Sequence, residues 1–339
     1  MGFGRLEWCA VALGVLCAAT ACKKKDVGSG GETAVLRDFD IEVEGNPFEG
    51  VGIYLPDYTN ADQARRRIQD EKPAEAALLS KIADTPQARW LGEWSGDVAT
   101  AVKNTVNAAR MRKEVPLFIA YNIPNRDCGQ HSAGGAAEAT TYQAWIEGLA
   151  GGIGSDWRAI VVLEPDALGH LTQCLDEQAQ AGRLAMLRRA VETLEALPGV
   201  RVYIDAGHSR WVPAEQMAAR LERAGIDVAR GFALNTSNFI ADDELIAYGN
   251  EIVARLGGRT HFIIDSSRNG NGAAPDNQWC NPPGRALGRR PTPVADGSAL
   301  DAFAWLKSPG ESDGSCNGGP PAGQWYHSMA LELASNAKW

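Results

Sequence analysis

Short apolar segments alternate with helical patterns along most of the chain, and no other feature limits its fold as strongly. Segments predicted to form strands cover residues 50–55, 117–122, 160–164, 202–205, 232–235, 262–265 and 302–306. Helical periodicity lies between and after them, at residues 97–111, 142–149, 177–197, 214–224, 242–256 and 322–337. Strands and helices in alternation indicate a parallel sheet with both faces covered. About seven such units favour a single-domain α/β fold, a parallel (β/α) barrel rather than an open sheet.

The predicted strands end in carboxylates. One segment, IVVLEPDALGH at residues 160–170, runs from four apolar residues directly into two acids around a proline. Because the active site of a parallel barrel lies where its strands end, these acids should line one pocket. Like charges in a small pocket raise at least one pKa, which leaves a protonated acid beside an ionised carboxylate. Glycoside hydrolysis requires such a pair. The acids at or after strand ends are Asp127, Glu164, Asp166, Asp205, Asp265, Glu311 and Asp313.

Other functional classes have weaker support. The net charge of −9 and the pI near 5.2 argue against a nucleic-acid partner, since no basic face is available to neutralise phosphates. No GxSxG or Ser-His-Asp order suggests a serine nucleophile. The GNG at residues 270–272 sits in a long loop rather than at a strand-to-helix turn, so it gives little support to dinucleotide binding. No CxxC or clustered Cys/His spacing indicates a metal, so we expect neither a metal nor an organic cofactor.

The N-terminal residues resemble an export signal. Residues 9–21 are almost entirely apolar and small, and this stretch is too short to span a bilayer. The sequence ATAC at residues 19–22 resembles a bacterial lipoprotein processing site, so residues 1–21 should be removed and Cys22 should carry lipid. Residues 22–45 would form a flexible tether. The exported protein would contact an outer membrane or cell surface through its lipid alone; the alternative is an ordinary signal peptide and a secreted product.

Four cysteines remain beyond the predicted signal and lipidation site: Cys128, Cys174, Cys280 and Cys316. An even number of cysteines in an exported protein indicates disulfide bonds, here two of them. Spacing alone leaves all three pairings open.

Six motifs follow one another along the chain: YNIPNRDCGQHSAGGA, VVLEPDALGH, YIDAGHSRW, IIDSSRNGNG, WCNPPGRALG and LDAFAWLKSPGESDGSC. Together and in this order they resemble glycoside hydrolase family 6, the inverting cellulases. The resemblance spans residues 46–339, which we expect to form the catalytic domain. It implies a distorted α/β barrel, in agreement with the count of predicted strands.

The resemblance implies roles for three aspartates. Asp166, in EPD, corresponds to the general acid; the alternative is a helix N-cap. Asp127, in RDC, corresponds to the carboxylate that supports protonation of the acid and the positive charge on the sugar; the alternative is a salt bridge with Arg126. Asp313, in GESDG, corresponds to the base; the alternative is a structural or substrate-binding role. Inversion requires an acid–base separation of roughly 6.5–9.5 Å.

Further positions correspond to sugar-contacting residues. Tyr121 would crowd the sugar at the cleavage point, and Ser132, on a mobile loop, would hold the attacking water. Trp90, Trp211 and Trp279 would line glucose subsites, where a flat indole suits the apolar C–H face of a pyranose. The remaining residues implied to contact sugar or tune the charge of the site are Asp205, His208, Lys307 and Glu311.

Other residues have predicted structural roles. Glu164 should be a structural partner, for instance of an arginine, and Asp265 and Arg268 should form an ion pair at the barrel rim. The family's disulfide pairing corresponds to Cys128–Cys174 and Cys280–Cys316. The tryptophans expected to pack in the interior are Trp94, Trp145, Trp157, Trp305 and Trp325.

The predicted activity is inverting hydrolysis of internal β-1,4-glucosidic bonds in cellulose or a soluble β-glucan, by a monomer. Alternatives are an exo-acting cellobiohydrolase of the same family, an inverting hydrolase of another β-glucan such as xyloglucan, and a lipid-anchored glucan-binding protein without catalysis. No separate cellulose-binding module is apparent, which favours soluble or amorphous glucan. Ala167 replaces a serine common in the family's EPDS stretch.

Overall fold

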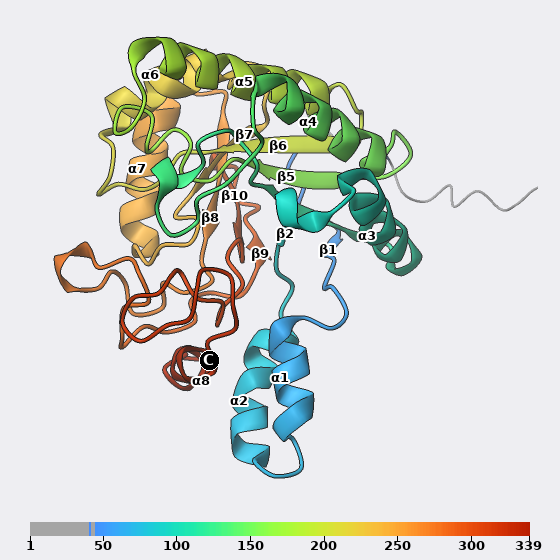
Figure 1. Cartoon of the computed structure of the whole chain (residues 1–339), viewed down its shortest axis with the longest axis vertical. Coiled ribbons are helices and arrows are strands. Elements are labelled where there is room, and N and C mark those ends of the chain that lie inside the picture. The colour runs from blue at the N-terminus through green and yellow to red at the C-terminus, as the bar shows by residue number, and fades with distance from the viewer. Residues whose placement is uncertain (1–40, 42–44) are drawn as a thin grey trace, which may run out of the picture. The chain divides into compact units, whose positions relative to one another are not determined.

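The apolar segments form one curved, mostly parallel sheet in the computed structural model (Figure 1). The sheet has eight strands, and only β9 (Thr292–Pro293) runs antiparallel to its neighbour. The parallel strands, in spatial order, are β2 (Arg89–Leu91), β4 (Leu117–Ala120), β5 (Ala159–Leu163), β6 (Val200–Asp205), β7 (Gly231–Leu234), β8 (His261–Asp265) and β10 (Leu300–Ala304). The predicted fold class, a distorted parallel barrel with about seven strands, is confirmed.

The structure describes residue 41 and residues 45–339. The predicted signal peptide, the lipidation site Cys22 and most of the predicted tether therefore lie outside the described residues. The described residues belong to one compact unit.

Successive side chains of a strand point to opposite sides of the sheet, so a strand whose residues are all buried is covered on both faces. All five residues of β5 and all five of β10 are buried. One set of alternate side chains fills the inside of the curve, with Ile119, Val162, Tyr203, Ile263 and Ala302 among them. The other set packs under the helices, with Phe118, Val161, Val202, Phe232 and Phe262 among them.

Helices cover the outside of the sheet (Figure 1). They are α3 (Val98–Arg112), α4 (Ala139–Ile153), α5 (Glu177–Glu195), α6 (Ala214–Ala224) and α7 (Asp242–Arg255). Sequence periodicity predicts all five. It predicts α8 (His327–Ser335) too long at the N-terminal end, where Gly323 has a φ of 78°. None of the helices in the described part of the chain is long and apolar enough to cross a bilayer.

Two further helices are absent from the sequence prediction. These are α1 (Asn60–Ile68) and α2 (Pro73–Ala83), which form an antiparallel hairpin (Figure 1). They pack with α8 around the buried indole of Trp305. Three consecutive arginines in α1 interrupt its apolar pattern, which explains why periodicity does not reveal it.

The first predicted strand is placed wrongly in the sheet. Residues 50–55 contain β1 (Gly52–Ile53), which pairs only with β3 (Glu114–Val115) in a separate two-stranded sheet. The edge position belongs to β2 instead, next to β4. β2 has three residues and includes Arg89, whose side chain turns to a carbonyl of α3. A strand this short, with a charged residue, shows no apolar run in the sequence.

The two ends of the parallel array meet without a continuous ladder. The backbone N–H of Ala88 donates to the carbonyl of Trp305 at 2.8 Å. Trp90 Nε1 donates to the carbonyl of Leu306, also at 2.8 Å. In the described residues, β2 and β10 are not paired as strands. The barrel is therefore distorted at this seam, where isolated hydrogen bonds replace a ladder.

The backbone at the carboxyl ends of the strands is unusual. Several residues other than glycine adopt positive φ there, among them Asn125, Asp127, Cys128, Glu164, Asp166, Asn235 and Ser237. Such conformations cost of order 1–3 kcal/mol each and gather at functional sites. This rim of the barrel is therefore the candidate site.

Candidate active site

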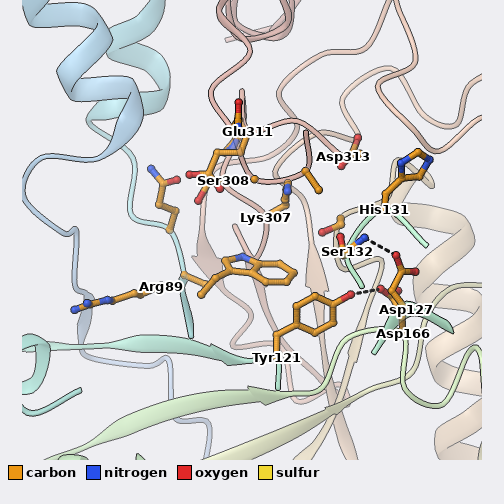
Figure 2. A pocket seen from close by; sticks show the side chains of 18 of the residues that line it. Arg89, Tyr121, Asp127, His131, Ser132, Asp166, Lys307, Ser308, Glu311 and Asp313 are labelled. Atoms are coloured by element: carbon orange, nitrogen blue, oxygen red, sulfur yellow. Dashed lines mark hydrogen bonds between the residues drawn. The ribbon is translucent and has the colours of Figure 1, made fainter. Parts of the chain in front are cut away.

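A cleft of about 1240 Å³ opens at the carboxyl ends of the parallel strands. This volume exceeds the roughly 300–1,000 Å³ of ordinary small-molecule pockets, so the cleft can hold an extended ligand. Asp127 and Asp166 lie close together, while Lys307, Glu311 and Asp313 lie across from them (Figure 2). Asp205 lies behind the surface, with 1% of its area exposed. The predicted residues that line the cleft are Trp90, Tyr121, Asp127, Ser132, Asp166, His208, Trp211, Trp279, Lys307, Glu311 and Asp313.

Glu164 braces the backbone that follows β4. Its carboxylate is fully buried and accepts the backbone N–H of Asn122 at 2.9 and 3.0 Å and that of Ile123 at 3.0 Å. Burial raises the pKa of Glu164 to about 7, although these amides favour the ionised form. Glu164 is a structural partner of the main chain, and the predicted arginine is wrong because no guanidinium binds this carboxylate within the described residues.

Asp166 points into the cleft from the same turn. Positive φ at Glu164 (50°) and Asp166 (69°) turns the backbone on either side of the proline, so the two acids take separate directions. The hydroxyl of Tyr121 donates to Asp166 Oδ2 at 3.3 Å (Figure 2). Burial and then the charge of Asp205 raise the pKa of Asp166 to about 7. No helix begins at Asp166, since the next one, α5, begins at Glu177. The side chain is therefore available as a proton donor near neutral pH.

Asp205, at the end of β6, supports the backbone of Asp166. Its Oδ2 accepts the backbone N–H of Asp166 at 3.0 Å and that of Gly207 at 3.1 Å. Burial raises the pKa of Asp205 to about 6, and these amides oppose the shift. Asp205 and Asp166 consequently titrate as a linked pair, and Asp205 acts on the site by charge rather than by direct contact with the cleft.

Asp127 lies on η2 (Asp127–Gly129), in the loop after β4. Its Oδ2 accepts the backbone N–H of Ser132 at 2.7 Å (Figure 2). The neighbouring Arg126 does not bind it, because Arg126 donates to both oxygens of Glu93 at 2.7 and 2.9 Å. The alternative of a loop salt bridge between Arg126 and Asp127 therefore does not describe this structure.

His170 is a cleft residue that the sequence left unassigned. Its Nε2 lies 3.4 Å from Asp127 Oδ1, and its Nδ1 lies 2.6 Å from Gln173 Oε1. Its ring packs edge-on against Trp211 at 4.7 Å between centroids. Burial lowers the pKa of His170, but the hydrogen bonds with Asp127 and Gln173 outweigh burial and raise it overall. Two oxygen acceptors around one imidazole suit the protonated form. In the sequence, the only signal that could have indicated a role for His170 is its position four residues after Asp166.

Arg268 pairs with Asp313 rather than with Asp265, so the predicted rim ion pair is wrong. The fully buried guanidinium of Arg268 holds Asp313 through Nη2–Oδ1 at 2.9 Å and Nη1–Oδ2 at 3.0 Å. Asp313 Oδ2 also accepts the backbone N–H of Asn281 at 3.1 Å. The carboxylate of Asp265 is already occupied by backbone N–H groups, those of Ser237, Ser267, Leu306 and Lys307.

Lys307 and Glu311 place polar groups beside the indole of Trp90. Lys307 Nζ lies 5.6 Å from the centroid of the Trp90 ring, and burial lowers the pKa of Lys307. Burial raises the pKa of Glu311, which accepts a hydrogen bond from Asn60 Nδ2 at 2.8 Å. Within the described residues, no group of three His, Cys, Asp or Glu side chains gathers in a way that could hold a metal ion.

More tryptophans line the cleft than the sequence predicts. Trp90, Trp211 and Trp279 line the cleft as expected, but so do Trp94 and Trp325. The predicted packing is wrong for Trp94, which is 54% exposed, whereas Trp325 lines the cleft and also packs against the core cluster of α1, α2 and α8. Trp94 lies on the short turn Glu93–Ser95, where the sequence gives no indication of exposure. The interior prediction is correct for Trp157 and Trp305.

Two disulfide bonds hold the loops of the site. They are Cys128–Cys174 and Cys280–Cys316, the pairing that the family resemblance implies. The first joins the loop that carries Asp127 to the segment after Asp166. The second joins the loop after Trp279 to the segment after Asp313. Each bond therefore links two segments that contribute to the cleft.

This α/β barrel carries an acid with a raised pKa, further carboxylates and indoles at the ends of its strands. Such a site defines a glycoside hydrolase. Comparison with known proteins narrows this class. The family model for glycosyl hydrolases family 6 matches residues 48–337. The chain belongs to this family.

Named relatives include endoglucanases and cellobiohydrolases. Endoglucanase A of Cellulomonas fimi is 47% identical over 85% of this chain, which spans 62% of that protein's length. Endoglucanase 1 of Streptomyces halstedii is 44% identical over 81% of this chain and 87% of its own. The solved endoglucanase Cel6 of Mycobacterium tuberculosis superposes with a TM-score of 0.81 at 43% identity, covering 86% of this chain and 99% of that one. The cellobiohydrolase Cel6A core of Chaetomium thermophilum gives a TM-score of 0.75 at 27% identity, over 87% and 99%.

Proposed function

We propose that this protein is an inverting endo-β-1,4-glucanase that acts on cellulose or a soluble β-glucan. The observation that carries the proposal is Asp166, a partly buried cleft carboxyl whose pKa is raised to about 7. An acid that keeps its proton near neutral pH can protonate a departing glycosidic oxygen. The relatives at 47% and 44% identity are named endoglucanases, which supports the endo assignment.

In the proposed reaction, Asp166 gives its proton to the glycosidic oxygen while the C1–O bond breaks and water adds to the opposite face of C1. Asp127, as a carboxylate on the same side of the cleft, stabilises the positive charge that develops on the sugar. Tyr121, which donates to Asp166, would crowd the sugar ring at this point. Ser132, whose backbone N–H binds Asp127, would hold the attacking water.

Asp313 is the proposed base. Its Oδ1 forms an ion pair with Arg268 and contacts no other polar group in the described residues, so a lone pair remains for a water molecule. That water transfers a proton to Asp313 while its oxygen bonds to C1, which inverts the configuration. Lys307, Glu311 and the indole platforms would hold glucosyl residues on either side.

A viscosity assay tests the endo assignment. Internal cleavage of carboxymethyl cellulose should lower viscosity steeply for few new reducing ends, whereas the exo-acting alternative would release reducing ends with little change in viscosity. A panel with xyloglucan and mixed-linkage glucan tests the substrate. Proton NMR of the first product should show the α-anomer, and retention of the β-configuration would contradict the mechanism.

The Asp166→Asn variant tests the acid itself and the non-catalytic alternative. Asparagine keeps the size of the side chain but cannot donate the proton, so turnover should fall by about 10²-fold or more. If the wild-type protein binds cello-oligosaccharides without turnover, the glucan-binding alternative holds instead.

We also propose that the protein is exported and anchored through lipid on Cys22, with residues 22–45 as a tether and residues 46–339 as the catalytic domain. The ATAC sequence at residues 19–22 supports this. Mass spectrometry of the mature N-terminus should find a lipidated cysteine, and Cys22→Ala should move activity from the membrane fraction to the medium or periplasm. An unmodified N-terminus would favour simple secretion.

A further inference from the structure

Trp94 is an exposed indole on the wall of the cleft. It lies on η1 (Glu93–Ser95), the turn that follows β2. More than half of its surface, 54%, is exposed, although tryptophan gains more than most side chains from burial. Because it lines the same cavity as the catalytic residues, its exposed surface faces the space that a ligand would occupy.

One side of the indole is held by Arg126. The guanidinium carbon of Arg126 lies 5.0 Å from the ring centroid of Trp94 and 4.6 Å from that of Tyr121. Arg126 is only 4% exposed and is fixed by Glu93 and by the carbonyls of Tyr121 and Ala133. The ring therefore rests on a rigid buried group, and little conformational freedom remains to be lost when a ligand binds it.

Gly92 allows this position. A Cβ atom at residue 92 would lie 2.4 Å from Trp94 Cζ3 and 2.5 Å from Cη2, closer than any side chain tolerates. The indole thus lies directly against the end of β2, with Gly92 beneath it and Arg126 beside it. Both contacts fix the ring while leaving over half of its surface exposed.

We propose that Trp94 is an additional sugar-stacking platform, which binds a glucosyl residue of the same β-glucan chain beyond the positions assigned to Trp90, Trp211 and Trp279. This inference rests on the proposed function. The apolar C–H face of a pyranose stacks on an indole. The guanidinium that supports Trp94 also contacts the ring of Tyr121, and Trp94, Tyr121 and Asp166 line one cavity, so a single glucan chain can span the acid and the platform. A chain bound there is the substrate itself.

The test compares substrates of different length. For Trp94→Ala, the KM for cellohexaose should rise about tenfold, the value of one lost aromatic contact. Its kcat and its KM for cellotetraose should stay near wild type, which also shows that the variant folds. Trp94→Phe should retain most of the affinity for cellohexaose. Trp339→Ala, an exposed tryptophan outside the cleft, is the matched control and should leave both KM values unchanged.

The outcomes separate this inference from the proposed function. An unchanged KM for cellohexaose in Trp94→Ala, or an equal loss on both substrates, would overturn the platform while the glucanase assignment stands. If the wild-type protein cleaves neither oligosaccharide, the proposed function fails. Calorimetric titration of cellohexaose then tests the platform alone, and equal affinities of wild type and Trp94→Ala would overturn it.

Discussion

Replacing Asp205 by asparagine should lower the pKa of Asp166 and move the alkaline limb of the pH–activity profile to lower pH. Asp205 Oδ2 accepts two backbone N–H groups, at 3.0 and 3.1 Å, and an asparagine oxygen can accept both. The substitution therefore removes a charge and keeps the hydrogen bonds. After burial, that charge is the largest cause that raises the pKa of Asp166 to about 7.

The magnitude follows from the loss of one neighbouring like charge, which lowers a buried carboxyl pKa by roughly one unit. With its pKa near 7, about half of Asp166 is protonated at pH 7 in the wild-type enzyme. With a pKa one unit lower, about a tenth is protonated, whereas at pH 5 the acid stays mostly protonated in both. The ratio of kcat/KM at pH 7 to kcat/KM at pH 5 should therefore fall about fivefold.

The assay is the pH profile of kcat/KM on a soluble β-glucan, with unfolding measured at each pH to exclude loss of structure. Asp227→Asn is the matched control, since this exposed carboxylate pairs with Arg188 far from the cleft. Its profile should match wild type. An alkaline limb that stays in place or moves to higher pH in Asp205→Asn would refute the coupling between the two acids.

Three further outcomes are expected. His170→Asn removes a cation that lowers the pKa of Asp166, so the alkaline limb should move to higher pH, opposite to Asp205→Asn, and His327→Asn should not move it. Arg268→Met leaves the buried carboxylate of Asp313 without its partner and should lower the free energy of unfolding by about 3–5 kcal/mol, against about 0–1 for Arg188→Met at a partly exposed pair; equal denaturant midpoints would contradict this. Glu164→Gln turns an amide donor toward the N–H groups of Asn122 and Ile123 and should cost about 1–3 kcal/mol. The folded pKa of Glu164 is raised from 4.5 to about 7, so its stabilisation is full below about 4.5 and is lost as pH rises through 7. Urea unfolding across this window should show a smaller pH dependence for Glu164→Gln than for wild type.

The sheet was predictable where strands are buried on both faces. The runs that became β4, β5, β6, β7, β8 and β10 are short and mostly apolar, although Arg201 lies within β6 and Asp301 within β10. The acids that follow were predictable as a group because parallel strands end at one rim. The edge strand β2 was not, since Arg89 lies in a segment only three residues long.

The ion pairs and hydrogen bonds between loops could not be predicted from the sequence. Arg268 is three residues from Asp265 and 45 from Asp313, yet it binds the latter, because the backbone N–H groups around Asp265 already occupy its carboxylate. Glu164 likewise binds the main chain of a neighbouring loop, at Asn122 and Ile123, rather than an arginine. Such choices depend on which loops meet in space. The exposure of Trp94 likewise depends on the packing of Arg126.

The two disulfides have a consequence for when the enzyme becomes active. Both join loops around the cleft, while the barrel interior is held without disulfides, by apolar packing and by strand pairing. A chain that still carries free thiols can therefore complete its barrel and yet leave the segments bearing Asp127 and Asp313 untethered. For the exported protein proposed above, oxidation after export would then act as a maturation step, and the chain would stay latent in the reducing compartment where it is made.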